Sequence, residues 1–228
     1  MSKLKRETIN NCLIICNGEI DKTLLTKFFN SDTPDKKFYI IAADGAANTL
    51  QKYGLAPDLI TGDFDSIEPA TLTFFKSQKN IEVRKIFNQN RNDLEKAFGF
   101  ALVKGFQKIH VLGATGSRPD HTLGNFSILK KFYKLSDIIF YDKDFEIFYC
   151  NEKAEFTYPK GEVISLMPMP RADKVTTKGL KYNLKNATLE FGKMISTLNS
   201  SSSDIVKIEM GKGDLLVFKK HFGEISYT

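Results

Sequence analysis

The sequence predicts an α/β fold, a mostly parallel sheet with flanking helices, followed by a smaller all-β sandwich domain. Residues 1–150 alternate short β-rich runs with helical patterns, which is typical of parallel strands joined by helical crossovers. Residues 151–228 contain further β-rich runs with no convincing helix between them. We therefore expect two domains, spanning residues 1–150 and 151–228.

The elements of the first domain follow in order from local patterns. Strands are expected at 12–16, 38–43, 58–62, 81–87, 108–113 and 137–141. Helices are expected at 23–29, 46–53, 69–77, 94–104 and 123–134. Pro69 fits the first turn of the third helix, Asn92-Asp93 can cap the fourth, and Gly105 can end it.

The second domain is expected to contain strands only. Its β-rich runs are 163–167, 174–177, 187–191, 205–210 and 214–219. The glycines at 211 and 213 predict a hairpin turn between the last two runs.

Composition restricts the class of partner. The formal net charge of +6 is shared evenly by the two parts, without the basic stripe that a nucleic-acid-binding protein shows, so no nucleic-acid partner is expected. No apolar run approaches the ~20 residues that cross a bilayer, and no secretory leader precedes Asn11, so no membrane association is expected. Three cysteines without a pairing framework favour a reducing, cytoplasmic location.

Carboxylates follow several strands of the first domain. Asp63 and Asp65 end one β-rich run, Asp44 with Gly45 follows another, and Asp93 opens a helix after a third. The carboxyl ends of parallel strands meet at one edge of the sheet, where ligands bind. Clustered carboxylates repel unless a cation lies between them, and Mg²⁺ prefers such oxygen ligands. The same residues also suit helix caps or a solvated turn, so the pattern leaves both interpretations open.

A glycine-bearing loop lies between a strand and a helix. It reads Gly113-Ala-Thr-Gly116-Ser-Arg118-Pro-Asp120-His121 and continues to Asn125. Backbone N–H groups of such a loop can bind phosphate, and Arg118 can add positive charge. The loop lacks the Lys-Ser or Lys-Thr ending of a Walker A motif.

Taken together, these segments resemble the thiamine pyrophosphokinase family. The similarity also includes Gln89 to Asp93 and, in the second domain, Gly179 to Tyr182 and Ser196 to Asn199. It implies a homodimer with an α/β nucleotide-binding domain and a β-sandwich domain for thiamine binding and dimerisation. It also implies transfer of diphosphate from ATP to the thiamine hydroxyl, with release of AMP.

The resemblance also assigns roles to individual residues. It implies that the catalytic Mg²⁺ site is formed by Asp63, Asp65 and Asp93. It implies that ATP is bound by Asp44, Gln89, Asn92, Gly116, Arg118, Asp120 and His121, and that Asp44 supports either the Mg²⁺ site or the substrate. It implies that thiamine is bound by Ser196 and Asn199.

The sequence departs from the family pattern at four positions. Asn90 and Asn92 stand where Asp and Thr are usual, Tyr182 replaces a frequent Trp, and Leu198 interrupts a Ser-Asn pair. These departures affect the expected thiamine contacts more than the ATP site. Two alternatives remain at this point, another Mg²⁺-dependent phosphotransferase or phosphohydrolase, and a nucleotide-sensing module without turnover.

Overall fold

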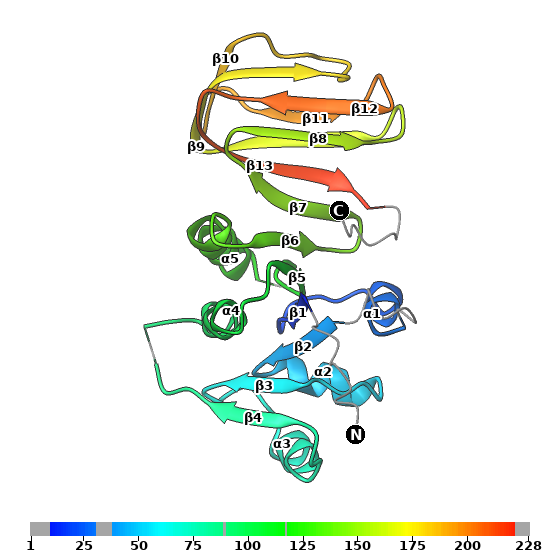
Figure 1. Ribbon diagram of the computed structural model, residues 1–228, viewed down its shortest axis with the longest axis vertical. Helices are drawn as coiled ribbons and strands as arrows, with labels where there is room; N and C mark the ends of the chain where they lie inside the picture. Colours follow the sequence, from blue (N-terminus) through cyan, green and yellow to red (C-terminus); the bar gives the residue numbers. More distant parts are fainter. Residues whose placement is uncertain (1–9, 31–37, 89, 117, 222–228) are drawn as a thin grey trace, which may run out of the picture. The chain divides into compact units, whose positions relative to one another are not determined.

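The computed structural model describes residues 10–30, 38–88, 90–116 and 118–221 of the chain. They form two compact units, and the division falls after Lys143 (Figure 1). The sequence predicts a boundary after residue 150, whereas β7 (Phe145–Cys150) pairs with β13 (Lys212–Lys220) of the second unit. The residues of an apolar run do not indicate which strands it will pair with, so the sequence alone could not assign β7 to the second unit.

The first unit contains a parallel sheet of six described strands. They are β1 (Asn11–Ile15), β2 (Phe38–Ala43), β3 (Leu59–Gly62), β4 (Glu82–Lys85), β5 (Lys108–Leu112) and β6 (Asp137–Tyr141). The strand order is β4-β3-β2-β1-β5-β6, and every pairing among them is parallel. All six strands are confirmed where the β-rich runs predict them, with small shifts at the ends.

Five described helices cover the two faces of this sheet. They are α1 (Lys22–Phe29), α2 (Ala46–Lys52), α3 (Pro69–Lys76), α4 (Asp93–Val103) and α5 (Pro119–Phe132). Successive residues of a strand face opposite sides, so Leu13 and Ile15 pack in one core with side chains of the first three helices. On the other face, Phe98 of α4 and Phe126 of α5 lie against Phe140. Figure 1 shows α4 and α5 together on one side of the sheet.

The strand order reverses direction at β1. From β1 the chain adds β2, β3 and β4 on one side, then crosses back through α4 to place β5 on the other side of β1. The carboxyl ends of β1 and β5 therefore diverge into loops that run to opposite sides. Such a switch point leaves a crevice in an open α/β sheet, and it is where ligands bind.

The second unit is all-β and sandwich-like within its described residues. Besides β7 and β13, its strands are β8 (Lys153–Thr157), β9 (Val163–Lys178), β10 (Ala187–Glu190), β11 (Ser196–Ser200) and β12 (Ile205–Glu209). The long strand β9 pairs with β10, β11, β12 and β13, always antiparallel. An apolar core that includes Ile164, Val206 and Val217 fills the interior.

Three expectations for strands need correction. The description "mostly parallel" fits the first unit alone, because the pairings of the second unit are antiparallel and the chain as a whole is mixed. The predicted strands 163–167 and 174–177 are one strand, β9, which continues through two prolines. The predicted hairpin between β12 and β13 does not form, since β12 pairs with β8 and β9 and β13 with β7 and β9.

No helix within the described ranges is long and apolar enough to cross a membrane.

Candidate metal and nucleotide site

A cavity of about 350 Å³ lies in the first unit at the switch point of the sheet. Its walls come from the loops after β1, β2 and β5 and from the first turns of α4 and α5. The lining residues include Asn17, Gly18, Asp44, Ser66, Asn92, Asp93, Thr115, Gly116, Arg118, His121 and Asn125. Segments far apart in the sequence thus converge on one polar cavity.

Asp44 follows β2 and is held in a left-handed backbone conformation, with φ of 45°. Asp adopts this conformation more readily than most residues. Its N–H donates to the Thr61 carbonyl of β3, and one carboxylate oxygen accepts a long 3.5 Å bond from the Ser66 N–H. The residue is only 1% exposed. Burial, then the charge of Asp93 and a hydrogen bond with Asp65, raise the pKa of Asp44 to about 7.

Asp63 is the first residue after β3, and its Oδ2 accepts a 3.1 Å hydrogen bond from the Lys96 ammonium. That bond, acting against desolvation, lowers the pKa of the Asp63 carboxyl. The next residue, Phe64, has φ of 66°, which turns the chain sharply away from the strand direction. Asp63 and Asp65 therefore do not lie on one extended strand.

Asp93 is the first residue of α4. The preceding Asn92 caps the helix, because its Oδ1 accepts a 2.9 Å bond from the Glu95 N–H. A carboxylate in the first helical turn also interacts favourably with the helix dipole. Asp93 Oδ1 accepts a 2.9 Å hydrogen bond from Lys96, one turn further along the helix.

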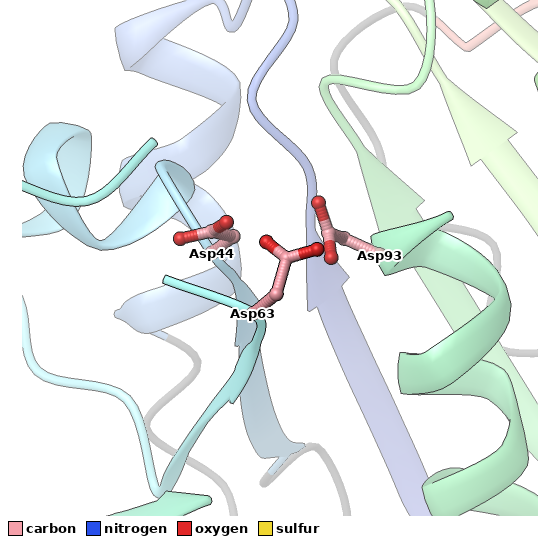
Figure 2. A group of neighbouring side chains, drawn as sticks. All are labelled: Asp44, Asp63 and Asp93. Atoms are coloured by element: carbon pink, nitrogen blue, oxygen red, sulfur yellow. The ribbon is translucent and has the colours of Figure 1, made fainter. Parts of the chain in front are cut away.

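Asp44, Asp63 and Asp93 come together as an acidic cluster, with one carboxylate oxygen of each within 4.8 Å of the others (Figure 2). In the described part of the chain, three buried side-chain oxygens have no hydrogen-bond partner: Asp44 Oδ1, Thr61 Oγ1 and Asp63 Oδ1. All three belong to the ends of β2 and β3. Buried polar atoms normally have partners, so these oxygens fit a site for a hard cation that takes oxygen ligands.

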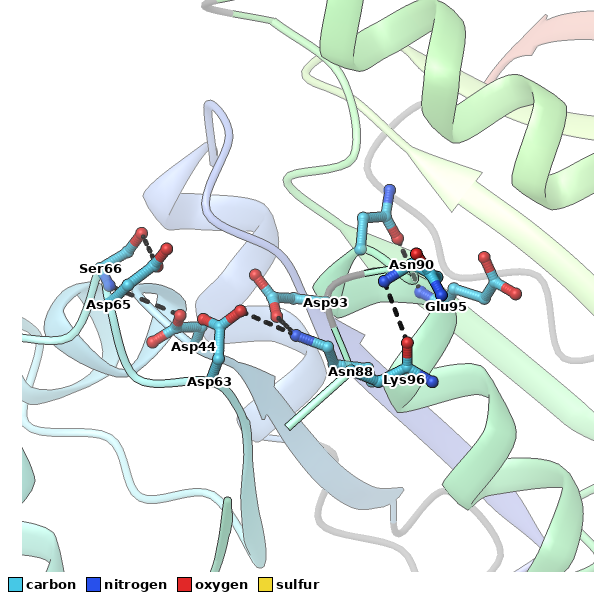
Figure 3. A network of polar contacts seen from close by, with 10 residues as sticks. Asp44, Asp63, Asp65, Ser66, Asn88, Asn90, Asp93, Glu95 and Lys96 are labelled. Atoms are coloured by element: carbon cyan, nitrogen blue, oxygen red, sulfur yellow. Dashed lines mark hydrogen bonds and ion pairs between the residues drawn. The ribbon is translucent and has the colours of Figure 1, made fainter. Parts of the chain in front are cut away.

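The acidic cluster differs from the predicted metal set in one member. Asp44, expected among the ATP-binding residues, lies inside it, whereas Asp65 is exposed and accepts a 2.8 Å bond from its neighbour Ser66. Figure 3 shows Asp65 and Ser66 on the far side of Asp44 from Lys96. The turn at Phe64 causes this arrangement.

The glycine-bearing loop forms another part of the cavity wall. Gly116 has φ of 83°, and a Cβ on it would lie 2.7 Å from the Glu19 side chain, so this position requires glycine. Asn125 of α5 donates from Nδ2 to the Ala114 carbonyl at 2.8 Å, and Asn92 donates to Asn125 Oδ1 at 3.4 Å. These bonds connect the loop with the capping residue of α4 and the second turn of α5.

The helix after this loop begins four residues earlier than the pattern predicts, with Pro119 in its first turn. Asp120 and His121 therefore lie in the first turn of α5 rather than in a loop. Arg118 forms a two-bond ion pair with Asp120, and both side chains are 64% exposed. Hydrogen bonding to Arg118 lowers the pKa of Asp120 to about 2. Arg118 and His121 line the cavity.

The predicted thiamine residues lie in the second unit. Ser196 is partly buried at the start of β11. Asn199 is 3% exposed, and its side chain accepts from the N–H groups of Tyr182 and Ser200 and donates to the Tyr182 carbonyl. The Asn199 amide thus fixes the turn at Tyr182, whose own side chain is exposed. Gln89, expected to bind ATP, lies outside the described residues.

Sequence reasoning missed two residues of the site, Lys96 and Asn17. The signal for Lys96 was its position three residues after Asp93, a spacing at which helical side chains meet. No sequence signal marked its contact with Asp63, which is 33 positions away. Asn17 carried no sequence signal, because it reaches the cavity wall only through the packing of the loop after β1 against Gly45.

Comparison with known proteins finds relatives that match both units of the chain. A family model described as "Thiamin pyrophosphokinase, catalytic domain" matches residues 32–141, and one described as "Thiamin pyrophosphokinase, vitamin B1 binding domain" matches residues 147–215. The chain is 30% identical over 209 residues to thiamin pyrophosphokinase 1 of Caenorhabditis elegans, covering 77% of this chain and 81% of that protein. It is 33% identical over 165 residues to thiamine pyrophosphokinase 1 of Oryza sativa subsp. japonica, covering 67% of this chain but 62% of the rice protein.

The fold is also shared with a solved relative. The crystal structure of thiamine pyrophosphokinase from Bacillus subtilis superposes with a TM-score of 0.80 at 25% identity, covering 92% of this chain and 98% of that one. The two family models thus match the two units in their order along the chain, and the Bacillus subtilis structure shares the fold over 92% of it. The chain belongs to the thiamin pyrophosphokinase family.

Proposed function

We propose that this chain transfers diphosphate from ATP to the hydroxyl group of thiamine, giving thiamine diphosphate and AMP. The observation that carries the proposal is the acidic cluster beside the switch-point cavity, in a chain of the thiamin pyrophosphokinase family. Three carboxylates and a glycine-bearing loop at one cavity suit a substrate that combines phosphate groups with a divalent cation.

Asp44, Asp63 and Asp93 would hold Mg²⁺, and Asp65, which influences the pKa of Asp44, would assist from outside the acidic cluster. The unpartnered oxygens of Asp44 and Asp63 support this assignment. When bound, the ion would offset the negative charge that develops on the phosphate oxygens during transfer. The protein's own contribution is to fix the positions of the carboxylates relative to the phosphates.

ATP would occupy the cavity with its phosphates between the acidic cluster and the glycine-bearing loop. The loop from Gly113 to Gly116 can present backbone N–H groups, and the first turn of α5 adds the positive end of a helix dipole. Arg118 would exchange Asp120 for phosphate, since the existing pair is exposed to solvent and a phosphate offers the guanidinium the same two-oxygen geometry with more negative charge. His121, Gln89 and Asn92 are proposed as further ATP contacts.

In the reaction, the thiamine hydroxyl oxygen would form a bond to the β-phosphorus of ATP. The bond between that phosphorus and the oxygen bridging to the α-phosphate would break, and AMP would leave with its electron pair. The hydroxyl proton would pass to a carboxylate at the acidic edge. Positioning and charge stabilisation supply most of the rate enhancement in such transfers.

The second unit is proposed to bind thiamine and to form a homodimer. Exposed apolar side chains on and around β10 and β11 support an interface there: Tyr182, Phe191, Met194, Ile195 and Leu198. Ser196 would contact thiamine directly. Asn199 would act by holding the turn at Tyr182.

A cytoplasmic location is proposed from the cysteines. Cys12, Cys16 and Cys150 are all buried and free, as expected in a reducing compartment.

Product identification tests the proposed function. Incubation with ATP, Mg²⁺ and thiamine should give AMP and thiamine diphosphate in equal amounts, and omission of thiamine should stop AMP formation. ADP with thiamine monophosphate would mean attack at the terminal phosphorus. Nucleotide hydrolysis at the same rate without thiamine would show a phosphohydrolase instead.

A further inference from the structure

Lys96 is a buried cation in contact with the acidic cluster. Its side chain is 2% exposed, and its ammonium lies 3.1 Å from Asp63 Oδ2 and 2.9 Å from Asp93 Oδ1 (Figure 3). Burial of an ammonium is costly unless it is paired and hydrogen-bonded. Burial works against the charge here, but the bonds to Asp93 and Asp63 outweigh it and raise the pKa of Lys96.

Lys96 does not line the switch-point cavity, although its helix neighbours Asp93 and Leu94 do. Its side chain is 2% exposed, so little of the ammonium is open to a ligand. It contacts two carboxylates from separate elements, the loop after β3 and the first turn of α4. Any effect of Lys96 on the reaction must pass through these carboxylates.

We propose that Lys96 is a positioning residue for the metal ion. It fixes one oxygen of Asp63 and one of Asp93, which turns the remaining oxygens towards the ion. The structure supports this division, because Asp63 Oδ2 is bonded to Lys96 whereas Asp63 Oδ1 is buried without a partner. The inference rests on the proposed function, which places a divalent ion at the acidic cluster.

The positive charge of Lys96 also compensates part of the negative charge of the acidic cluster. With the ion bound, all three carboxylates of the acidic cluster would be ionised, and the buried ammonium would offset one of the three charges. The remaining charge of −2 matches a single divalent ion. Partners of metal ligands typically change ion affinity about 10–100-fold when they are removed.

The competing explanation is a structural ion pair that only joins β3 to α4. Such a pair would affect unfolding and leave ion binding unchanged in the folded protein. Manganese binding without nucleotide separates the two, measured by the loss of the electron paramagnetic resonance signal of free Mn²⁺. The variants are Lys96→Met and Lys96→Arg, with Lys131→Met as the matched control. Lys131 of α5 is exposed and forms a 2.6 Å ion pair with Glu95, which lies beside Lys96 on α4.

We expect the wild-type chain and Lys131→Met to bind Mn²⁺ equally. Lys96→Met should bind about 10–100-fold more weakly, and Lys96→Arg should fall between them, because it keeps the charge with a different geometry. Raising Mg²⁺ should restore turnover to Lys96→Met, which a general loss of structure would not allow. If Lys96→Met does not fold, Lys96→Gln takes its place with the same expectation.

Unchanged or tighter Mn²⁺ binding by a folded Lys96→Met or Lys96→Gln chain would overturn the inference and leave the metal site standing. Absence of Mn²⁺ binding by the wild-type chain would instead overturn the metal site, and the role of Lys96 with it. Circular dichroism melting of the metal-free chains shows which variants are folded.

Discussion

At the scale of single residues, the site holds side chains in conditions that do not favour folding. The Asp44 carboxyl is buried beside other carboxylates, and its backbone is left-handed. A Cβ on the neighbouring Gly62 would lie 2.7 Å from the Asp44 Cβ, so only glycine allows this approach. Arrangements of this kind are common at functional sites, where binding of a ligand compensates for the cost.

The substitution Asp44→Asn should therefore raise stability while removing function. In EDTA at pH 8, we expect the free energy of unfolding to rise by about 1–2 kcal/mol, because a buried like charge is lost. Added Mg²⁺ should stabilise the wild-type chain by mass action and the variant much less. Thermal melting with and without Mg²⁺ measures both effects.

Asp137→Asn serves as the control, since Asp137 is an exposed carboxylate at the start of β6. It should leave both melting temperatures and the response to Mg²⁺ unchanged. An Asp44→Asn chain that melts lower in EDTA, or that keeps the full Mg²⁺ response, would show that Asp44 is structural.

At the scale of elements, the first turn of α4 organises half of the site. Its capping residue Asn92 sets where the helix begins, and this places Asp93 at the acidic cluster and Lys96 one turn behind it. Asn92 also donates to Asn125 of α5. The cap thus links helix formation to the geometry of the carboxylates.

Replacing Asn92 should therefore lower the stability of the protein and weaken the binding of ATP. Asn92→Ala should lower the free energy of unfolding by about 1 kcal/mol, whereas Asn92→Asp keeps an oxygen acceptor and should cost much less. Urea denaturation gives the stabilities, and the KM for ATP should rise in the alanine variant because Asn92 lines the cavity. Equal values for wild type and Asn92→Ala would mean that the cap sets neither property.

The sequence predicts the elements of the first unit well, because each strand and helix there carries its own periodicity and end signals. It predicts the second unit less well, because antiparallel pairing depends on partners that are distant along the chain. The two prolines of β9 suggest an interruption that its partners β10, β11 and β13 override. The turn after β12 suggests a hairpin, although β12 pairs elsewhere.

The acidic cluster likewise has features that local patterns predict and contacts that depend on distant segments. Strand ends predict that Asp44, Asp63 and Asp93 meet, and the structure confirms that they do. The resemblance groups Asp65 with Asp63 and Asp93, but the turn at Phe64 leads the chain away from the strand direction before Asp65. The contact between Lys96 and Asp63 depends on how α4 packs near β3, and local patterns do not report that packing.

At the scale of the whole molecule, the proposed homodimer makes each thiamine site depend on two chains. The exposed apolar side chains near β10 and β11 are the candidate interface, and Leu198 is 82% exposed. A twofold dimer buries the same surface of both subunits. It would also let Ser196 of one chain complete the acidic site of the other.

Mixing two inactive variants tests this arrangement. Asp63→Asn removes a carboxylate of the acidic cluster, and Ser196→Arg fills the thiamine site. In a dimer with shared sites, each mixed dimer has one site with both lesions and one with neither. Equal mixing should then restore about a quarter of wild-type activity.

Mass spectrometry under native conditions confirms that mixed dimers form. If they form and no activity returns, each site is built from a single chain. A monomer at working concentration would contradict the dimer itself.

The position of the metal ion tests the central claim most directly. A crystal of the wild-type chain grown with Mn²⁺ and a non-hydrolysable ATP analogue should show an anomalous peak bounded by Asp44, Asp63 and Asp93. Ligand distances close to the ~2.0–2.1 Å of Mg²⁺ are expected, and the Lys96 ammonium should remain on Asp63 and Asp93. A peak away from these carboxylates, or a nucleotide outside the switch-point cavity, would contradict the account.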